Sequence, residues 1–257
     1  PGRPAAVADV QSAGVRDNYD VVYDWADNIG KGNWPEDKCV FTREFGEMVD
    51  DWYAHNNINR AARSWGERPM LMAALSLCDT YGEMYHGQRQ FIGGQWHPFD
   101  HQRGYHPDTY YGGIYDAFRQ KKYAFEMFRS QDRNAEPMVF IANEMTQFSD
   151  NDVTVFSNCD SVRLTMFEGD KVMTLPVVHN DNDKPCAPVV FKDFWNFWAA
   201  REYSYKQRNW QRVSLLAEGI KDGKVVAVQK KMPSRRSTKL RLYADDMGRK
   251  LNADGSD

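Results

Sequence analysis

The stretch "VFTREFGEMVDDW", Val40–Trp52, joins a short apolar run to a charged pair and a glycine. The apolar start predicts a buried strand. Arg43 and Glu44 end that strand, and Gly46 lets the chain turn sharply directly beyond them. Two interpretations of Glu44 stay open: a carboxylate held at the mouth of a pocket to do chemistry, or an acid that opens a helix over 46–54, where the helix dipole favours negative charge.

Similar apolar runs surround this stretch in the first half of the chain. They are "AAVADV" (5–10), "YDVVYDW" (19–25), "KCVFTRE" (38–44) and "QFIGGQW" (90–96). Two segments with helical spacing of apolar residues, 58–78 and 111–131, accompany them. Alternating strands and helices predict right-handed βαβ units and an α/β domain. In an α/β barrel, functional side chains lie at the carboxyl ends of strands, which is where Glu44 stands.

From about Pro137 the pattern changes to strands of alternating polarity. The predicted strand segments are 138–145, 152–158, 161–173, 212–232 and 238–245. "EGD" and "KDGK" supply hairpin turn signals inside two of them. The pattern indicates an all-β sandwich, most simply an immunoglobulin-like one. We expect an aromatic-rich insertion near 189–210, either a helix-bearing segment or a packed aromatic loop, and two domains over 1–133 and 134–257.

Composition narrows the function classes. Among the 257 residues, 33 Lys and Arg face 36 Asp and Glu, for a net charge of −3. This balance argues against nucleic-acid and anionic-membrane partners, which need a basic patch. The four cysteines are far apart and share no C-x-x-C spacing, so buried free thiols are expected. The 14% aromatic content either fills a core or supplies rings that stack on sugars.

A second group of polar residues follows the last predicted strand of the first half. Trp96, His97, Asp100 and His101 occupy a long irregular loop within 93–113. Such a loop is costly to order without a purpose. The two histidines are four apart, but the intervening proline disfavours a helical ligand pair, so no metal is expected. The loop favours contacts to substrate hydroxyls, or ion pairs that order it.

Strand alternation puts Tyr23 and Trp25 on one face of their strand, either as core packing or as part of a site. With these residues the chain resembles glycoside hydrolase family 2, the β-galactosidase and β-glucuronidase group, particularly its Bacteroidetes-type β-galactosidases. The motifs that carry the resemblance are Arg43-Glu44-Phe45-Gly46, Gly93-Gly94-Gln95-Trp96, Arg3-Pro4, "DVVY" (20–23) and "SNCDSVRLTMFEGDKV" (157–172).

The resemblance implies the C-terminal part of a TIM (β/α)8 barrel over 1–133 and an immunoglobulin-like β-sandwich over 134–257. It implies that Glu44 is the nucleophile of a retaining mechanism. Arg43, or a neighbouring tyrosine hydroxyl for which Tyr23 is the candidate, would hold Glu44 ionised. The implied substrate-binding residues are Trp96 as the floor of the subsite, His97, Asp100 and His101 as its rim, and Trp25.

The resemblance also implies the partners. The substrate would be an oligo- or polysaccharide ending in β-galactose. The resemblance is also compatible with a homo-oligomer. No cofactor is required, although a structural or activating Mg, Na or Ca ion fits the longer enzyme. A periplasmic or secreted bacterial location is expected.

The family's acid/base Glu stands upstream of the Arg-Pro motif, so we expect it outside these residues. Glu47 and Glu83 have easy surface explanations. The chain is then an internal piece of a longer enzyme and inactive by itself. One alternative is a β-glucuronidase, although its Asn-x-Lys-Gly motif is not found. Another is a non-catalytic carbohydrate-binding or assembly module that presents Trp195, Trp198 and Trp210.

Overall fold

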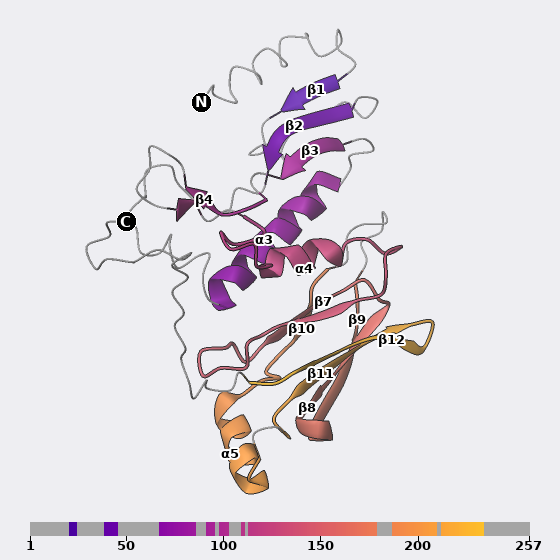
Figure 1. Ribbon diagram of the computed structural model, residues 1–257. Helices are drawn as coiled ribbons and strands as arrows, with labels where there is room; N and C mark the ends of the chain where they lie inside the picture. Colours follow the sequence, from indigo (N-terminus) through magenta and orange to yellow (C-terminus); the bar gives the residue numbers. More distant parts are fainter. Residues whose placement is uncertain are drawn as a thin grey trace, which may run out of the picture.

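The computed structural model describes residues 21–24, 39–45, 67–85, 91–95, 98–102, 109–110, 113–178, 187–209 and 212–233 (Figure 1). Strands β1 to β5 and the later part of α3 are described by their backbone alone. The predicted strand over 5–10 lies outside the described residues, as does the one over 238–245.

The first half contains a three-stranded parallel sheet. Its strands are β1 (Val21–Asp24), β2 (Cys39–Phe45) and β3 (Phe91–Gln95), in the order β1-β2-β3. They coincide with the runs predicted as buried strands. Between β2 and β3 along the chain lies helix α3, Glu67–Tyr85, which extends beyond the predicted end at residue 78. Two short antiparallel strands follow, β4 (His101–Gln102) and β5 (Thr109–Tyr110).

The predicted helix over 111–131 is wrong for most of its length, because only α4, Tyr123–Arg129, is helical. Before it the chain makes turns. The Asp116 carboxylate accepts hydrogen bonds from the backbone N–H groups of Phe118 (2.8 Å) and Gln120 (2.7 Å). This local bonding competes with a helix. Phe118, which the helical spacing assigned to a packed face, is 75% exposed.

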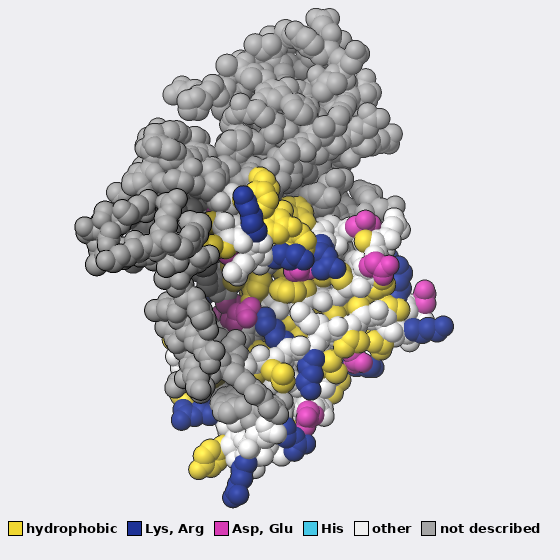
Figure 2. Space-filling view, viewed as in Figure 1, with side chains coloured by type: hydrophobic (Ala, Val, Ile, Leu, Met, Phe, Trp, Pro, Cys, Tyr) yellow, Lys and Arg dark blue, Asp and Glu magenta, His cyan; other side chains and the backbone are white. Residues whose placement is uncertain are grey.

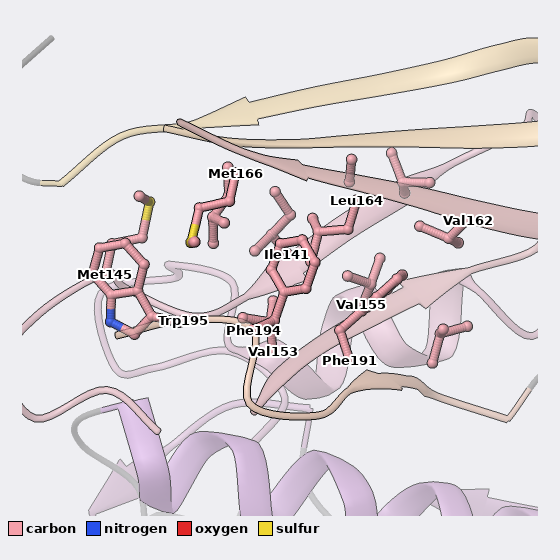
Figure 3. Packing of buried hydrophobic residues seen from close by; sticks show 14 of the residues in the cluster. Ile141, Met145, Val153, Val155, Val162, Leu164, Met166, Phe191, Phe194 and Trp195 are labelled. Carbon is pink, nitrogen blue, oxygen red and sulfur yellow. The ribbon is translucent and has the colours of Figure 1, made fainter. Parts of the chain in front are cut away.

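The second half is a sandwich of two antiparallel sheets. The first has the order β10-β7-β6, and the second has the order β12-β11-β8-β9. The bounds are β6 Val139–Ala142, β7 Val153–Ser157, β8 Ser161–Met166, β9 Lys171–Pro176, β10 Val189–Phe191, β11 Leu215–Lys221 and β12 Lys224–Lys231. Figure 3 shows the inward-facing side chains of both sheets interdigitating, among them Ile141, Val155 and Leu164. The coarse prediction of an antiparallel β-rich second half is therefore confirmed.

The two predicted hairpin turns are present. A 3-10 turn, η3 (Phe167–Gly169), joins β8 to β9, and Asp222 and Gly223 join β11 to β12. Asp222 and Gly223 both have positive φ, 50° and 73°, the conformation that a type I′ hairpin turn requires. Glycine adopts it without steric cost, so the Asp-Gly pair fixes the register of this hairpin.

The segment 189–210 is less of an interruption than predicted. Its start is β10, which pairs with β7 inside the sandwich, and its later part is helix α5, Phe197–Gln207. Trp195 is only 1% exposed and lies in the sandwich core (Figure 3), whereas Trp198 is 66% exposed. Trp210 lies outside the described residues. Trp195 therefore cannot be presented to a glycan together with Trp198.

A second hydrophobic core joins helices α3 and α4 to the sandwich. Every residue of β7 is buried, because Val153 and Val155 face the sandwich core while Phe156 faces the helices. The fully buried residues Ala74, Leu77 and Met127 pack on this helix-facing side. We name this cluster the helix–sandwich core; its buried members are Leu71, Ala74, Leu77, Cys78, Tyr123, Ala124, Met127, Ala142 and Phe156. Side chains from both sides of position 133 thus form one packed unit.

The surface of the described part of the chain carries both positive and negative side chains. On the face shown in Figure 2, Lys and Arg side chains are interspersed with Asp and Glu. This agrees with the near-neutral balance of the sequence.

Candidate active site

The carboxyl ends of the three parallel strands meet at one edge of the sheet. Tyr23 pairs with Phe41, and β1 ends one residue later, at Asp24. Phe45, the last residue of β2, pairs with Gln95, the last residue of β3. Parallel strands bring residues that are distant in sequence to a common edge in this way.

Strand β2 carries an irregularity at the residues that opened the sequence analysis. Thr42 pairs with Gly93 and Phe45 pairs with Gln95, so Arg43 and Glu44 together stand opposite the single residue Gly94. One strand therefore has an extra residue, as in a β-bulge. Bulges bend a strand and re-aim side chains, and they are over-represented next to active sites. The glycine pair Gly93-Gly94 lies on the neighbouring strand β3, and glycine inside a strand is typical of a close backbone approach.

The predicted catalytic residues thus belong to neighbouring strands. Tyr23 is on β1, and Arg43 and Glu44 are on β2. Tyr23 pairs with Phe41, and Glu44 lies three residues beyond Phe41 toward the carboxyl end of β2. Tyr23 and Glu44 are therefore on adjacent strands but are not directly opposite one another. His101 begins β4. Trp25, Trp96 and His97 lie outside the described residues.

Asp100, predicted as part of the hydroxyl-binding rim or of a loop-ordering ion pair, is buried. It is 3% exposed, and its Oδ1 accepts hydrogen bonds from the Lys122 ammonium (2.7 Å) and the Gly113 N–H (2.9 Å). Its own backbone N–H donates to the Tyr115 carbonyl at 3.0 Å. These contacts correspond to the loop-ordering ion pair that the sequence left open. Asp100 therefore lies in the interior of the loop.

Burial acts on both members of this ion pair. It raises the pKa of the Asp100 carboxyl and lowers the pKa of the Lys122 ammonium, and the hydrogen bond between them opposes both shifts. Burial disfavours the charged form of each group, so each charge depends on the other. The Asp100–Lys122 ion pair therefore joins the loop beyond β3 to the segment before α4, and loss of either charge would leave the other buried without a counter-ion.

Glycine is required where this loop closes. A Cβ atom at Gly113 would lie 2.3 Å from the backbone N of Asp100 and 2.5 Å from the carbonyl O of Tyr115. Backbone atoms cannot give way as a side-chain tip can. The close approach of these segments therefore depends on the missing side chain.

The sequence resembles known glycosidases over most of its length. Over 241 residues, 89% of this chain, it is 30% identical to a β-galactosidase of Thermoanaerobacter pseudethanolicus, of which it covers 30%. The fold is similar to that of a β-glucuronidase from glycoside hydrolase family 2, with a TM-score of 0.56 and 19% identity over 86% of this chain and 22% of that one. A β-glycosidase from Bacteroides vulgatus has a TM-score of 0.54 and 14% identity, with 90% of this chain and 34% of that one covered.

The resemblance to glycoside hydrolase family 2 is confirmed. No protein-family model matches the chain. The chain spans between 22% and 34% of the length of these three glycosidases. The solved structures are less than 20% identical to it, so they support the fold and not the substrate.

Lys122 is the residue of this loop that the sequence pattern did not predict. It stood inside a segment predicted to be helical, where a lysine is expected on the solvated face. Its partner Asp100 is 22 residues away, and no local pattern links the two. The available signal was the pair of glycines at 112–113, which argues against a helix that begins there.

The described ranges contain no group of three or more His, Cys, Asp or Glu side chains that could hold a metal ion. Within these same ranges, every helix is too short or too polar to cross a membrane.

Proposed function

We propose that this chain is part of a retaining, exo-acting β-galactosidase of glycoside hydrolase family 2. In this proposal residues 1–133 form the C-terminal part of the (β/α)8 barrel and residues 134–257 form an immunoglobulin-like domain. The 30% identity to a β-galactosidase over 241 residues supports the choice of sugar. The parallel strands with α3 between β2 and β3, and the antiparallel sandwich after them, support the architecture.

The observation that carries the proposal is the bulge at Arg43 and Glu44. It stands at the carboxyl end of β2, opposite Gly94 of β3. In barrel enzymes this edge holds the reacting groups. Bulges are over-represented next to active sites, which supports a functional role for Glu44 at this place.

The proposed chemistry needs two carboxyl groups about 5–5.5 Å apart. Glu44 attacks the anomeric carbon and forms a covalent glycosyl-enzyme, while the second carboxyl group donates a proton to the leaving oxygen. The second group then removes a proton from water, which releases the sugar with its configuration retained. By the resemblance, this acid/base residue comes from outside the present chain.

The other predicted residues take supporting roles in this proposal. The Arg43 guanidinium and the Tyr23 hydroxyl favour the ionised form of Glu44. Trp96 and Trp25 offer aromatic faces for the apolar face of the galactose ring. His97 and His101 donate to its hydroxyl groups, and Asp100 orders the loop that carries them through its ion pair with Lys122. The substrate is an oligo- or polysaccharide with a terminal β-galactose, and the reaction requires no cofactor.

The decisive experiment replaces the proposed nucleophile in the complete enzyme. We expect Glu44→Gln to lower kcat/KM for an aryl β-galactoside by at least about a thousandfold, about 4 kcal/mol of transition-state stabilisation. The matched control is Glu202→Gln on α5, which loses the same charge at an exposed position. Activity of Glu44→Gln within about tenfold of the parent would contradict the assignment.

Two further assays separate the alternatives. An aryl β-galactoside should be hydrolysed in preference to the matching β-glucuronide, and the reverse order would favour a β-glucuronidase. The 257-residue chain alone should show no turnover, because it lacks the acid/base group. A measurable turnover by this chain would refute the view that the second carboxyl group comes from elsewhere.

A further inference from the structure

A group of polar side chains, distinct from the proposed active site, connects helices α3 and α4 to the sandwich. We call it the polar joint; its members are Glu67, Tyr123, Glu144, Ser149 and Lys231. Glu67, the first residue of α3, accepts a hydrogen bond at Oε2 from the Ser149 hydroxyl at 2.5 Å. The Tyr123 hydroxyl of α4 and the Lys231 ammonium of β12 both donate to Glu144 Oε1, the latter at 2.8 Å.

The joint lies beside the helix–sandwich core. Tyr123 is 4% exposed and belongs to that core, and its ring meets the ring of Phe140 edge-on, with centroids 5.5 Å apart. The Lys231 ammonium lies 5.8 Å from the centroid of the Phe140 ring. The polar contacts and the apolar contacts therefore hold the same two parts of the chain together.

The charges of the joint do not balance when both carboxyl groups are ionised. Lys231 pairs with Glu144, at 2.8 Å. Glu67 receives a hydroxyl hydrogen bond from Ser149 and a backbone hydrogen bond from Glu144, and it faces the Glu144 carboxylate. Among the described residues, the titratable groups that act on Glu67 and Glu144 are Tyr123 and Lys231. One positive charge thus serves two carboxyl groups.

The pKa directions follow from this arrangement. Burial raises the pKa of Glu67, and the negative charge of Glu144 adds to the increase. Burial also acts to raise the pKa of Glu144, but the hydrogen bonds from Lys231 and Tyr123 outweigh it and lower that pKa. The two carboxyl groups therefore have pKa values shifted in opposite directions, so Glu67 takes up a proton before Glu144 as the pH falls.

We propose that the polar joint, in which one ammonium group serves two carboxyl groups, is a pH-dependent contact between the sandwich and helices α3 and α4 that weakens when Glu67 loses its proton. The loss leaves two carboxylates facing one ammonium group at a half-buried interface. Such an uncompensated charge destabilises an interface.

The sign of the pH effect follows by linkage. Because the pKa of Glu67 is raised in the folded protein, its stabilising contribution is complete below the ordinary value of 4.5 and is lost as the pH rises through the raised pKa. Because the pKa of Glu144 is lowered, its contribution is present above 4.5 and is lost as the pH falls through the lowered pKa. The ionisation of Glu67 therefore determines how the stability of the joint changes as the pH rises from 4.5 toward neutral.

The test compares the pH dependence of Tm for the intact protein and the Glu67→Gln variant between about pH 5 and about pH 8. We expect the Tm of the parent to fall relative to that of Glu67→Gln as the pH rises, because glutamine cannot ionise. Glu202→Gln is the matched control, and its Tm should follow that of the parent. Parallel curves for the parent and Glu67→Gln would overturn the proposal.

A second variant keeps the proposal open to refutation if Glu67→Gln does not fold. The Ser149 hydroxyl stabilises the ionised form of Glu67, so Ser149→Ala should extend the fall in Tm to higher pH. If the fall in Tm ended at the same pH as in the parent, or at a lower pH, the result would count against the proposal. Hydrogen exchange locates the effect: deprotonation should increase exchange in α4 and β6, and leave the β8–β11 pair unchanged. Equal increases everywhere would indicate global destabilisation and would overturn the joint as its cause.

Discussion

Phe156 tests whether the helices and the sandwich fold as one unit. It is 1% exposed, belongs to the helix–sandwich core, and its ring is parallel to that of Phe140 with centroids 6.5 Å apart. Replacing a buried Phe by Ala costs about 3–5 kcal/mol. We expect about 4 kcal/mol or more, since the neighbouring Ala74, Leu77 and Met127 are fully buried on two helices and have little freedom to fill the cavity.

The assay is equilibrium unfolding of the intact protein in urea, followed by circular dichroism and by fluorescence. With a slope of about 2–3 kcal/mol per molar urea, 4 kcal/mol corresponds to a decrease in midpoint of about 1.3–2 M. Both signals should change together, because the substitution removes packing that the two parts share.

The control is Phe148→Ala, the same chemical change at a position that is 83% exposed. It should alter the free energy of unfolding by no more than about 0.5 kcal/mol. If Phe156→Ala shifts the midpoint by less than about 0.5 M, the reasoning is refuted. Two separate transitions in the parent, only one of them sensitive to Phe156, would refute it as well.

Two further predictions concern the loop beyond β3. Gly113→Ala should destabilise the protein by about 3 kcal/mol or more, because its Cβ would lie 2.4 Å from the carbonyl carbon of Phe99; an unchanged urea midpoint would contradict this. Lys122→Met should cost about 3–5 kcal/mol, because it leaves the Asp100 carboxylate buried without its cation. Adding Asp100→Asn should restore part of the lost stability, and a double variant no more stable than Lys122→Met would show that the unpaired charge is not the cause.

The strands were predictable because their signals are local. Short apolar runs marked β1, β2 and β3, and alternating polarity marked β8, whose Val162 and Leu164 are buried. The Asp222-Gly223 turn was predictable because few residue pairs adopt positive φ at both positions. The segment before α4 was not, since its apolar spacing mimics a helix and the Asp116 side chain decides against one.

The candidate site also contains features with a local sequence signal and features without one. Glu44 was predicted from a short motif, whereas its place in a bulge opposite Gly94 became visible only in the folded sheet. The Asp100–Lys122 pair and the polar joint could not be predicted, because their partners are far apart in sequence: 22 residues for the pair and 82 for Glu67 and Ser149. Burial, which gives these contacts their importance, is a property of the folded chain and not of any one segment.

The most direct test of the central claim is covalent labelling of the nucleophile. A fluorinated galactoside that forms the glycosyl-enzyme quickly and releases it slowly should label the intact enzyme once, and peptide mass mapping should find the sugar on Glu44. The Glu44→Gln variant should remain unlabelled, while Glu202→Gln should be labelled like the parent. A label on another carboxylate, or undiminished labelling of Glu44→Gln, would contradict the assignment of Glu44 as the nucleophile.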